Sequence, residues 1–219
     1  MREKIKIKEK RENLKEEEER KFSPKEEYIL KFTLLGKILK EKEKFKISSL
    51  EELKERVRGP GKRLKPLNEA IEVLIKTNVL EIENGQIKKI NWENLERAFE
   101  ETNGGKIFEL VKENKVLNQP LLQRLLKKEL QKEGKKIPSY YVLSGEISAL
   151  LAYGLLTRVR VGGEFLLVSP ELRRELEEIS EEESPRERKR KRKKWEEKIW
   201  EKFEEVRKKF EENSENKVN

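Results

Sequence analysis

The sequence lacks three of the residue types on which enzymes most often depend. It contains no histidine and no cysteine, and all 44 acidic residues are glutamate because aspartate is absent as well. Without imidazole or thiolate there is no common proton shuttle, no cysteine nucleophile and no His/Cys zinc site. Metal-dependent nucleases and phosphotransferases usually rely on aspartate. We therefore expect a non-catalytic protein without a metal or cofactor, and a nuclease built on glutamate and lysine ranks third among the candidate functions.

Other absences narrow the class of protein further. The lack of cysteine removes any disulfide framework. No apolar run approaches the roughly 18 residues of a membrane span, and the first residues do not resemble a signal peptide. Charged residues make up 44% of the chain, with lysine and glutamate dominating, which is typical of proteins from hyperthermophiles. The sequence thus predicts a cytoplasmic protein of a hyperthermophile or its mobile element.

Positive charge is concentrated at the two ends of the chain. The formal net charge is +9, of which residues 1–22 contribute +2 and residues 185–219 contribute +5. The part between them is nearly neutral, so a basic face there must come from local clustering.

Helical order is expected to begin after a charged arm. Residues 1–22 contain few apolar positions and a run of four glutamates, which predicts disorder. Ser23, Pro24 and Glu26 then form a capping box with a first-turn proline. Apolar residues recur on one predicted helix face, as Tyr28, Ile29, Phe32, Leu35, Ile38 and Leu39. A second capping box at Ser49 predicts a short helix to about residue 57.

The segment RVRGPGKRLKPLNEA, residues 56–70, raises the question of a nucleotide site. A phosphate-binding P-loop requires G-x-x-x-x-G-K-[ST] after a strand. Here Arg56 stands at the first glycine position, Arg63 stands at the hydroxyl position, and a helix precedes the motif. The segment instead predicts a tight turn into a helix that begins near Lys65, because Pro66 suits a first helical turn.

The order of predicted elements occurs twice. Two strand-like runs, residues 79–83 and 86–90, flank the hairpin signal Asn84-Gly85, and a closing helix is expected to stop at Asn103-Gly104-Gly105. Helices are then predicted over KIFELVKEN, NQPLLQRLLKKELQKEG and SGEISALLAYG, followed by a hairpin around Gly162-Gly163 and a helix capped by Ser169. We therefore predict two similar units, residues 23–103 and 104–183.

Helix, helix, turn, helix and hairpin is the order of a winged helix, and residues 23–179 resemble tandem winged-helix proteins, many of which bind DNA. The resemblance implies an α+β fold, mainly α with small β-hairpins, made of two tandem winged-helix domains plus a C-terminal amphipathic helix. It also implies that the third helix of each unit, residues 62–76 and 144–153, enters a DNA groove while the hairpin flanks the backbone. The second of these helices offers Glu146 and hardly a cation or amide for base edges.

Two groups of residues in the predicted units are candidates for contact with DNA. The first comprises five cations interrupted by no acid: Arg56, Arg58, Lys62, Arg63 and Lys65. They suit phosphate contact at the start of a helix or form an ordinary solvated turn. Asn68 faces outward beside two glutamates, which favours positioning over sequence readout. Arg158 and Arg160 project from one face of the second hairpin and either enter a minor groove or pair across the strands with Glu164.

The tail changes character at Ser184. We interpret residues 184–194 as a basic linker that attracts polyanions through Arg186, Arg188, Lys189, Arg190, Lys191, Arg192, Lys193 and Lys194. Residues 195–213 are predicted to form an amphipathic helix with an apolar stripe of Trp195, Ile199, Phe203, Val206 and Phe210. Because like charges extend a linker, we favour pairing of this stripe with a second copy or a partner protein over docking within the chain. Residues 214–219 are expected to be disordered.

Together these patterns predict a protein that binds double-stranded DNA, as a transcription regulator or a factor in DNA replication or maintenance. The alternative is a winged-helix module or scaffold for protein–protein interaction, in which the basic tail serves only solubility. The target sequence, and a preference for DNA over RNA, do not follow from these residues.

Overall fold

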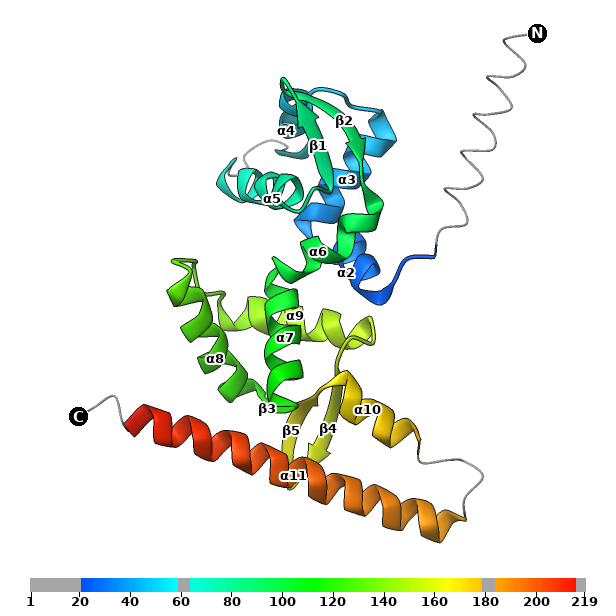
Figure 1. Cartoon of the computed structure of the whole chain (residues 1–219), viewed down its shortest axis with the longest axis vertical. Coiled ribbons are helices and arrows are strands. Elements are labelled where there is room, and N and C mark those ends of the chain that lie inside the picture. The colour runs from blue at the N-terminus through cyan, green and yellow to red at the C-terminus, as the bar shows by residue number, and fades with distance from the viewer. Residues whose placement is uncertain (1–20, 59–63, 179–183, 216–219) are drawn as a thin grey trace.

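The computed structural model of the chain describes residues 21–58, 64–178 and 184–215. These residues are mainly helical with two small antiparallel sheets, which confirms the expected α+β class. Figure 1 shows two halves, one above the other, with a long C-terminal helix across the far end of the second. We call residues 21–102 the first half and residues 103–215 the second half. No described helix is long and apolar enough to cross a membrane.

The first half contains helices around one hairpin. In chain order its elements are α2 (Pro24–Phe32), α3 (Leu34–Phe45), α4 (Leu50–Arg58), α5 (Leu64–Lys76), β1 (Leu80–Glu83), β2 (Gln86–Ile90), the 3-10 turn η1 (Trp92–Asn94) and α6 (Leu95–Glu100). The predicted capping box at Ser23 is present, since Ser23 and Glu26 each accept a backbone hydrogen bond from the other. The predicted arm lies outside the described residues except for its last two.

The single helix expected after Ser23 is two helices, which corrects the predicted apolar face. Thr33 adopts an extended conformation between α2 and α3. Its hydroxyl donates to the Ile29 carbonyl at 2.8 Å and accepts from the Gly36 amide at 3.3 Å, so it both ends α2 and caps α3. Gly36 permits the sharp change of direction, because a Cβ atom there would overlap the backbone of α2. Phe32 consequently leaves the apolar face and is 45% exposed.

The hairpin of the first half forms at the predicted turn. Asn84 and Gly85 both have positive φ angles, as a two-residue turn between right-twisted strands requires. Ser49, just before α4, forms an isolated bridge to Gln86, and the Ile87 amide donates to the Ser48 carbonyl at 2.6 Å. The hairpin is therefore joined to the chain segment between α3 and α4.

The second half begins where the sequence predicted a stop. Gly104 and Gly105 lie in the first turn of α7 (Asn103–Asn114), whose start is capped by Thr102. A Cβ atom at Gly104 would overlap the Tyr28 ring, and one at Gly105 would overlap the Phe99 carbonyl. These glycines allow α7 to pack closely on the first half, so close packing and not helix termination explains them.

The second half adds a strand that the sequence did not reveal. Its further elements are β3 (Val116–Asn118), α8 (Gln119–Lys132), α9 (Tyr140–Ala152), β4 (Thr157–Val161), β5 (Glu164–Val168), α10 (Pro170–Glu177) and α11 (Pro185–Glu215). The strand order is β3-β5-β4, all antiparallel, so β5 is central. Ser139 caps α9, which starts four residues before the predicted Ser144. The predicted hairpin at Gly162-Gly163 is present as β4–β5.

The predicted basic linker is helical, which corrects its interpretation. Helix α11 begins at Pro185 and includes the whole cationic run. The Ser184 hydroxyl accepts from the Glu187 amide at 3.4 Å and donates to the Glu187 carboxylate at 2.7 Å, so the helix start is capped. Arginine and lysine are good helix formers, and their charge does not prevent helix formation once the start is capped.

The apolar stripe of α11 docks on its own chain, contrary to our expectation of a dimer. Trp195, Ile199 and Phe203 are 6%, 0% and 1% exposed. The Trp195 indole donates to the Leu172 carbonyl at 3.0 Å, and Lys198 pairs with Glu175 on α10 at 2.6 Å. Helix α11 lies across the second half, next to α10 and the β4–β5 hairpin (Figure 1). The surface on which the predicted dimer depended is thus largely buried within one chain.

A small group of side chains joins the two halves. The Tyr28 hydroxyl on α2 donates a hydrogen bond to the Glu146 carboxylate on α9, and the ring packs edge-on against Tyr153 at 6.1 Å between centroids. The Lys25 ammonium lies 5.5 Å from the Phe99 ring centroid and 5.2 Å from the Phe108 ring centroid, so it contacts aromatic rings of both halves. The halves therefore pack directly on each other.

Candidate nucleic-acid interface

Two of the basic residues predicted to contact DNA, Arg56 and Lys65, lie close to acidic or aromatic side chains. The Arg56 Nε atom lies 3.5 Å from a Glu41 carboxylate oxygen, and the guanidinium carbon lies 3.1 Å from the Phe45 ring centroid. Lys65 lies 3.9 Å from a Glu69 oxygen. The run looked free of acids because Glu41 is distant in sequence and Glu69 follows one helical turn later. Neither Arg56 nor Lys65 therefore presents an unpaired charge.

The other candidates in this region are exposed or lie outside the description. Arg58 is exposed at the end of α4, and Asn68 is exposed on α5. Lys62 and Arg63 lie outside the described residues. The structure thus places Arg58 and Asn68 on the surface.

The next candidates for contact with DNA are the two arginines of the β4–β5 hairpin. Arg158 and Arg160 are exposed on alternate positions of β4, as predicted. Their guanidinium carbons lie 5.3 and 5.6 Å from the ring centroid of Phe165 on β5. The considered pairing with Glu164 is wrong, because Glu164 stands opposite Val161 in the register and accepts a hydrogen bond from Asn118 at 2.8 Å. Among the described residues, neither arginine has a carboxylate within ion-pair distance.

The tip of this hairpin is supported by α11. A Cβ atom built on Gly162 would lie 2.8 Å from the ring of Trp200, so the turn sits directly against that indole. Gly162 and Gly163 both have positive φ angles, which suits a two-residue turn. The hairpin is also paired with β3 on its other edge and is therefore fixed on two sides.

The cationic run occupies the first turns of α11, beyond the docked part of the helix. All of its eight cations lie between residues 186 and 194, and Glu187 is the one acid among them. Hydrogen bonds from the Ser184 hydroxyl and amide lower the pKa of Glu187, which keeps this carboxylate charged at the helix start. Arg192 and Lys193 reach Glu196 and Glu197 one turn later, at 3.2 and 3.7 Å. Because cations face every side of the helix, part of the run faces solvent in any docking geometry.

Helix α9 presents an uncharged surface, in line with its sequence. Glu146, the one charged side chain of the predicted groove segment, points inward to Tyr28. Burial raises the pKa of Glu146, and the Tyr28 hydrogen bond opposes this shift in part. The exposed residues at the start of the helix are Tyr140, Tyr141 and Val142, at 56%, 85% and 47%. Sequence reasoning missed them because it placed the helix start after them, and the cap at Ser139 was the available signal.

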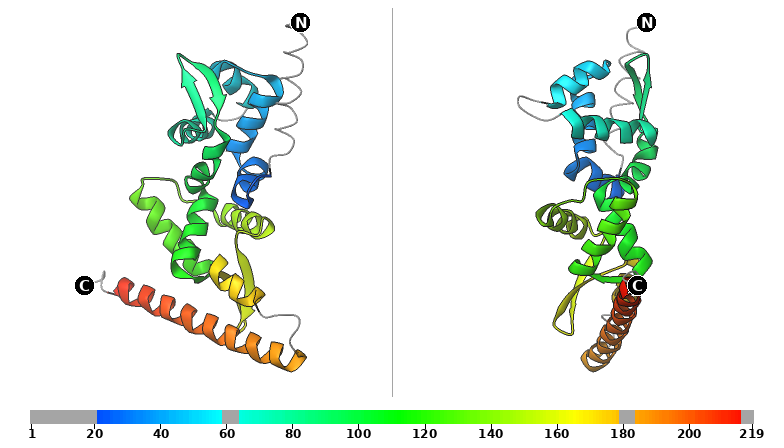
Figure 2. Two further views of the ribbon diagram at one scale, coloured as in Figure 1. Left: turned by 45° about the vertical axis from the view of Figure 1, so that its right-hand side comes forward. Right: turned by 90° about the vertical axis from the view of Figure 1, so that its left-hand side faces the viewer.

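Helix α9 and the β4–β5 hairpin lie on the same side of the second half. Both project toward the left edge in the right-hand view of Figure 2, and in Figure 1 α9 passes behind α7. The exposed tyrosines are at the start of α9, and Phe165 and the two arginines are on the β4–β5 hairpin.

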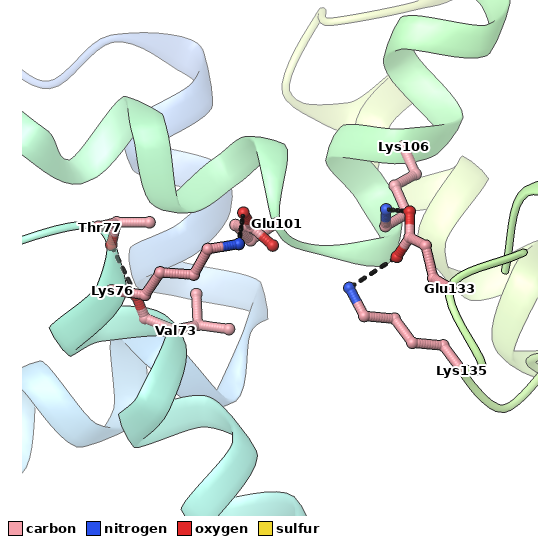
Figure 3. Close-up of polar contacts among 7 residues, drawn as sticks. All are labelled: Val73, Lys76, Thr77, Glu101, Lys106, Glu133 and Lys135. Carbon is pink, nitrogen blue, oxygen red and sulfur yellow. Dashed lines mark hydrogen bonds and ion pairs between the residues drawn. The ribbon is translucent and has the colours of Figure 1, made fainter.

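A cleft between the halves has a volume of about 940 Å³ and is lined by paired charges. Lys76 on α5 lies 2.6 Å from Glu101, while Glu133 accepts hydrogen bonds from Lys106 and Lys135 (Figure 3). Those two lysines lower the pKa of Glu133 to about 2, so this carboxylate is a poor proton acceptor near neutral pH. Of the side chains drawn in Figure 3, Lys76 and Glu101 form one ion pair, and Glu133 forms ion pairs with Lys106 and Lys135, whereas the Thr77 hydroxyl donates to the Val73 carbonyl.

Three further results bear on the chemistry of the surface. Within residues 21–58, 64–178 and 184–215, no three carboxylates gather in a way that could hold a metal ion. Arg158 and Arg160 on the β4–β5 hairpin lie beside the Phe165 ring, and the basic run in the first turns of α11 contains one acid, Glu187. A comparison of the chain with protein families, curated proteins and solved structures finds no match.

Proposed function

We propose that the chain is a tandem winged-helix protein that binds double-stranded DNA without catalysing a reaction. The two halves share an order of elements that supports this proposal. The first half runs from α3 through the Ser49 bridge to α4, α5 and the β1–β2 hairpin. The second half runs from α7 through β3 to α8, α9 and the β4–β5 hairpin. Apart from the Ser49 bridge and β3, each half runs helix, helix, helix and hairpin, which is the order on which the resemblance to winged-helix proteins rests.

The observation that carries DNA binding is the unpaired charge on the second hairpin. Arg158 and Arg160 are exposed and rest on an aromatic ring, so their charge is not neutralised by a carboxylate among the described residues. The cationic turns of α11 belong to the helix that supports the same hairpin through Trp200. Phosphate oxygens are the natural partners of arginine side chains arranged on a rigid surface.

Salt dependence of binding tests this proposal. Fluorescence anisotropy with a labelled duplex should show affinity that falls steeply with salt, because each neutralised phosphate contributes a slope of about −0.9 to log K against log salt. Changing Arg158 and Arg160 to Ala should reduce that slope by about 2. In the matched control, Lys88 and Lys89 on the first hairpin are changed to Ala. Because these lysines already pair with Glu83 and Glu81, the slope should change far less. Binding that is absent at low salt, or independent of salt, contradicts the proposal.

We further propose a cytoplasmic role as a regulator or as a replication or maintenance factor. Selection of bound duplexes from a random library separates these roles. Enrichment of one sequence supports a regulator, whereas binding without enrichment supports a maintenance factor that contacts the backbone.

A second candidate is a protein–protein interaction module, which the exposed start of α9 favours. Tyr140 and Tyr141 pack edge-on at 6.1 Å between ring centroids, with Val142 beside them. Tyrosine is enriched at protein interfaces because it combines an apolar ring with a hydroxyl group. If the duplex titration fails while the Tyr141→Ala variant loses a partner captured by the wild-type chain, this candidate replaces DNA binding.

A further inference from the structure

Phe165 is an apolar side chain displayed on a strand that otherwise faces the core. It is 59% exposed, whereas the next three residues of β5 are buried. The other large exposed apolar residues of the described chain lie on helices, so Phe165 alone among them stands on a sheet.

The surroundings of the ring are cationic. Arg160 is the direct cross-strand partner of Phe165, and Arg158 lies two residues away on the same face of β4. Both guanidinium groups lie within cation–π distance of the ring. An apolar partner protein would have to desolvate both charges to cover the ring, which is costly. A polyanion with an apolar interior suits the ring and the charges together.

The hairpin is built to hold the ring firmly. Phe165 is on the central strand β5 and pairs with Arg160 of β4, β3 pairs with residues 166–168 directly after it, and the hairpin turn packs against Trp200. The Asn118 side-chain amide donates a hydrogen bond to the Glu164 carboxylate at 2.8 Å, which fixes the residue before Phe165. A side chain that separates stacked bases must be held rigidly by the backbone that carries it. The pairing of β5 in the sheet and the packing of the turn against Trp200 provide this rigidity.

We propose that Phe165 is a wedge that enters the minor groove, partly unstacks one base step and bends the duplex. This inference rests on the proposed DNA binding and deepens it. The duplex has stacked, apolar base faces inside a polyanionic exterior, which matches an apolar ring beside two arginines. Apolar wedges of this kind kink DNA by about 20 to 90°, and arginine is favoured by the negative potential of a narrow minor groove.

Resonance energy transfer between the ends of a doubly labelled duplex of about 30 base pairs tests the bend. Saturation with the full chain should raise the transfer efficiency, and 2-aminopurine placed at a flexible step should brighten as its base unstacks. Phe165→Ala should lose both signals. Phe165→Leu should retain them, because leucine is also an effective wedge but offers no aromatic face for stacking.

Matched variants keep the test interpretable. Phe32→Ala removes an exposed phenylalanine from α2 of the first half and should leave bending unchanged. Thermal melting of each variant establishes that it folds before it is assayed. If the chain binds the duplex but the wild type does not bend it, or Phe165→Ala bends it equally, the wedge is wrong while DNA binding stands. If the chain binds no duplex, DNA binding itself fails.

A single-stranded oligonucleotide separates the wedge from base stacking. A ring that stacks on unpaired bases would give tighter binding to the single strand, and Phe165→Leu would then weaken that binding as much as Phe165→Ala. That result overturns the wedge, since leucine would no longer substitute for the ring.

Discussion

Each of the two hairpins carries two basic residues. Those of the first hairpin lie beside carboxylates, whereas those of the second lie beside an aromatic ring. On the first hairpin, Lys88 lies 2.9 Å from Glu83 and Lys89 lies 3.9 Å from Glu81, so its cations are paired. On the second, Arg158 and Arg160 rest on Phe165 instead of a carboxylate. The comparison teaches that pairing within the fold, and not the number of cations, decides where a nearly neutral domain attracts a polyanion.

The two helices predicted to enter a DNA groove, α5 in the first half and α9 in the second, also differ in their charged side chains. Helix α5 lines the cleft between the halves, and its Lys76 is bound to Glu101. In helix α9 the one acidic side chain, Glu146, is half-buried and accepts a hydrogen bond from Tyr28, and exposed tyrosines are at the helix start. Both differences support our proposal that the second half carries the DNA-binding surface.

The largest expected effect concerns α11, which supports the second hairpin and has no counterpart in the first half. Phe203→Ala removes a ring that is 1% exposed and should lower the free energy of unfolding by about 3–5 kcal/mol. The same change at Phe165, 59% exposed, should alter it by less than about 0.5 kcal/mol. Guanidinium unfolding measures both. Equal losses at the two positions would show that α11 does not stabilise the second half.

Charge reversal on each hairpin gives the next largest effect. Changing Arg158 and Arg160 to Glu should lower duplex affinity by roughly two orders of magnitude at low salt, because two attractive contacts become repulsive. Lys88→Glu with Lys89→Glu should lower it by far less, since those charges are already neutralised within the first hairpin. Anisotropy titration compares the two, and a reversed ranking would move the interface to the first half.

Loss of the Tyr28–Glu146 hydrogen bond between the halves should have a smaller effect, which is on the free energy of unfolding. Tyr28→Phe leaves the Glu146 carboxylate without its hydroxyl donor and should cost about 1–3 kcal/mol of unfolding free energy. Because burial raises the folded-state pKa of Glu146, the folded chain holds this proton more tightly than the unfolded chain. Stability therefore falls as the pH rises from 4.5 through the raised pKa. Glu146→Gln should flatten that dependence in unfolding curves, and an unchanged slope would contradict it.

The smallest effect is expected at Glu133, where the pH dependence has the opposite sign. Its pKa is about 2 in the folded chain, against 4.5 ordinarily, so its contribution is present above 4.5 and is lost as the pH falls toward 2. Glu133→Gln should slightly lower the melting temperature at neutral pH and reduce its loss on acidification. Glu129→Gln, which removes an exposed partner of Lys132, is the control. Identical acid melting curves for the two variants would exclude a role for Glu133.

Local signals in the sequence predicted much of the fold. The capping box at Ser23, the Asn84-Gly85 turn and the Gly162-Gly163 turn each depend on residues within one turn of each other, and each is present. The exposure of Arg158 and Arg160 followed from strand alternation. These features are set by backbone sterics and short-range hydrogen bonds, which neighbouring residues reveal.

The errors came from contacts distant in sequence. Gly104 looks like a helix stop until Tyr28 is placed against it, and the stripe at Phe203 looks unpartnered until α11 folds back. Arg56 looks free until Glu41 and Phe45 approach it. The candidate site was only partly predictable for the same reason, since the role of Phe165 depends on its exposure and on its register with Arg160.

Because residues 185–194 already belong to α11, their contact with a polyanion needs little ordering of the backbone. A disordered basic tail loses roughly 1–2 kcal/mol of chain entropy for each residue that it fixes on a surface. Ten helical residues instead form a rigid rod of about 15 Å whose cations are spaced before binding. The contact of Trp200 with Gly162 sets the direction of that rod relative to the hairpin. The spacing between the two proposed DNA contacts is therefore a property of the free chain.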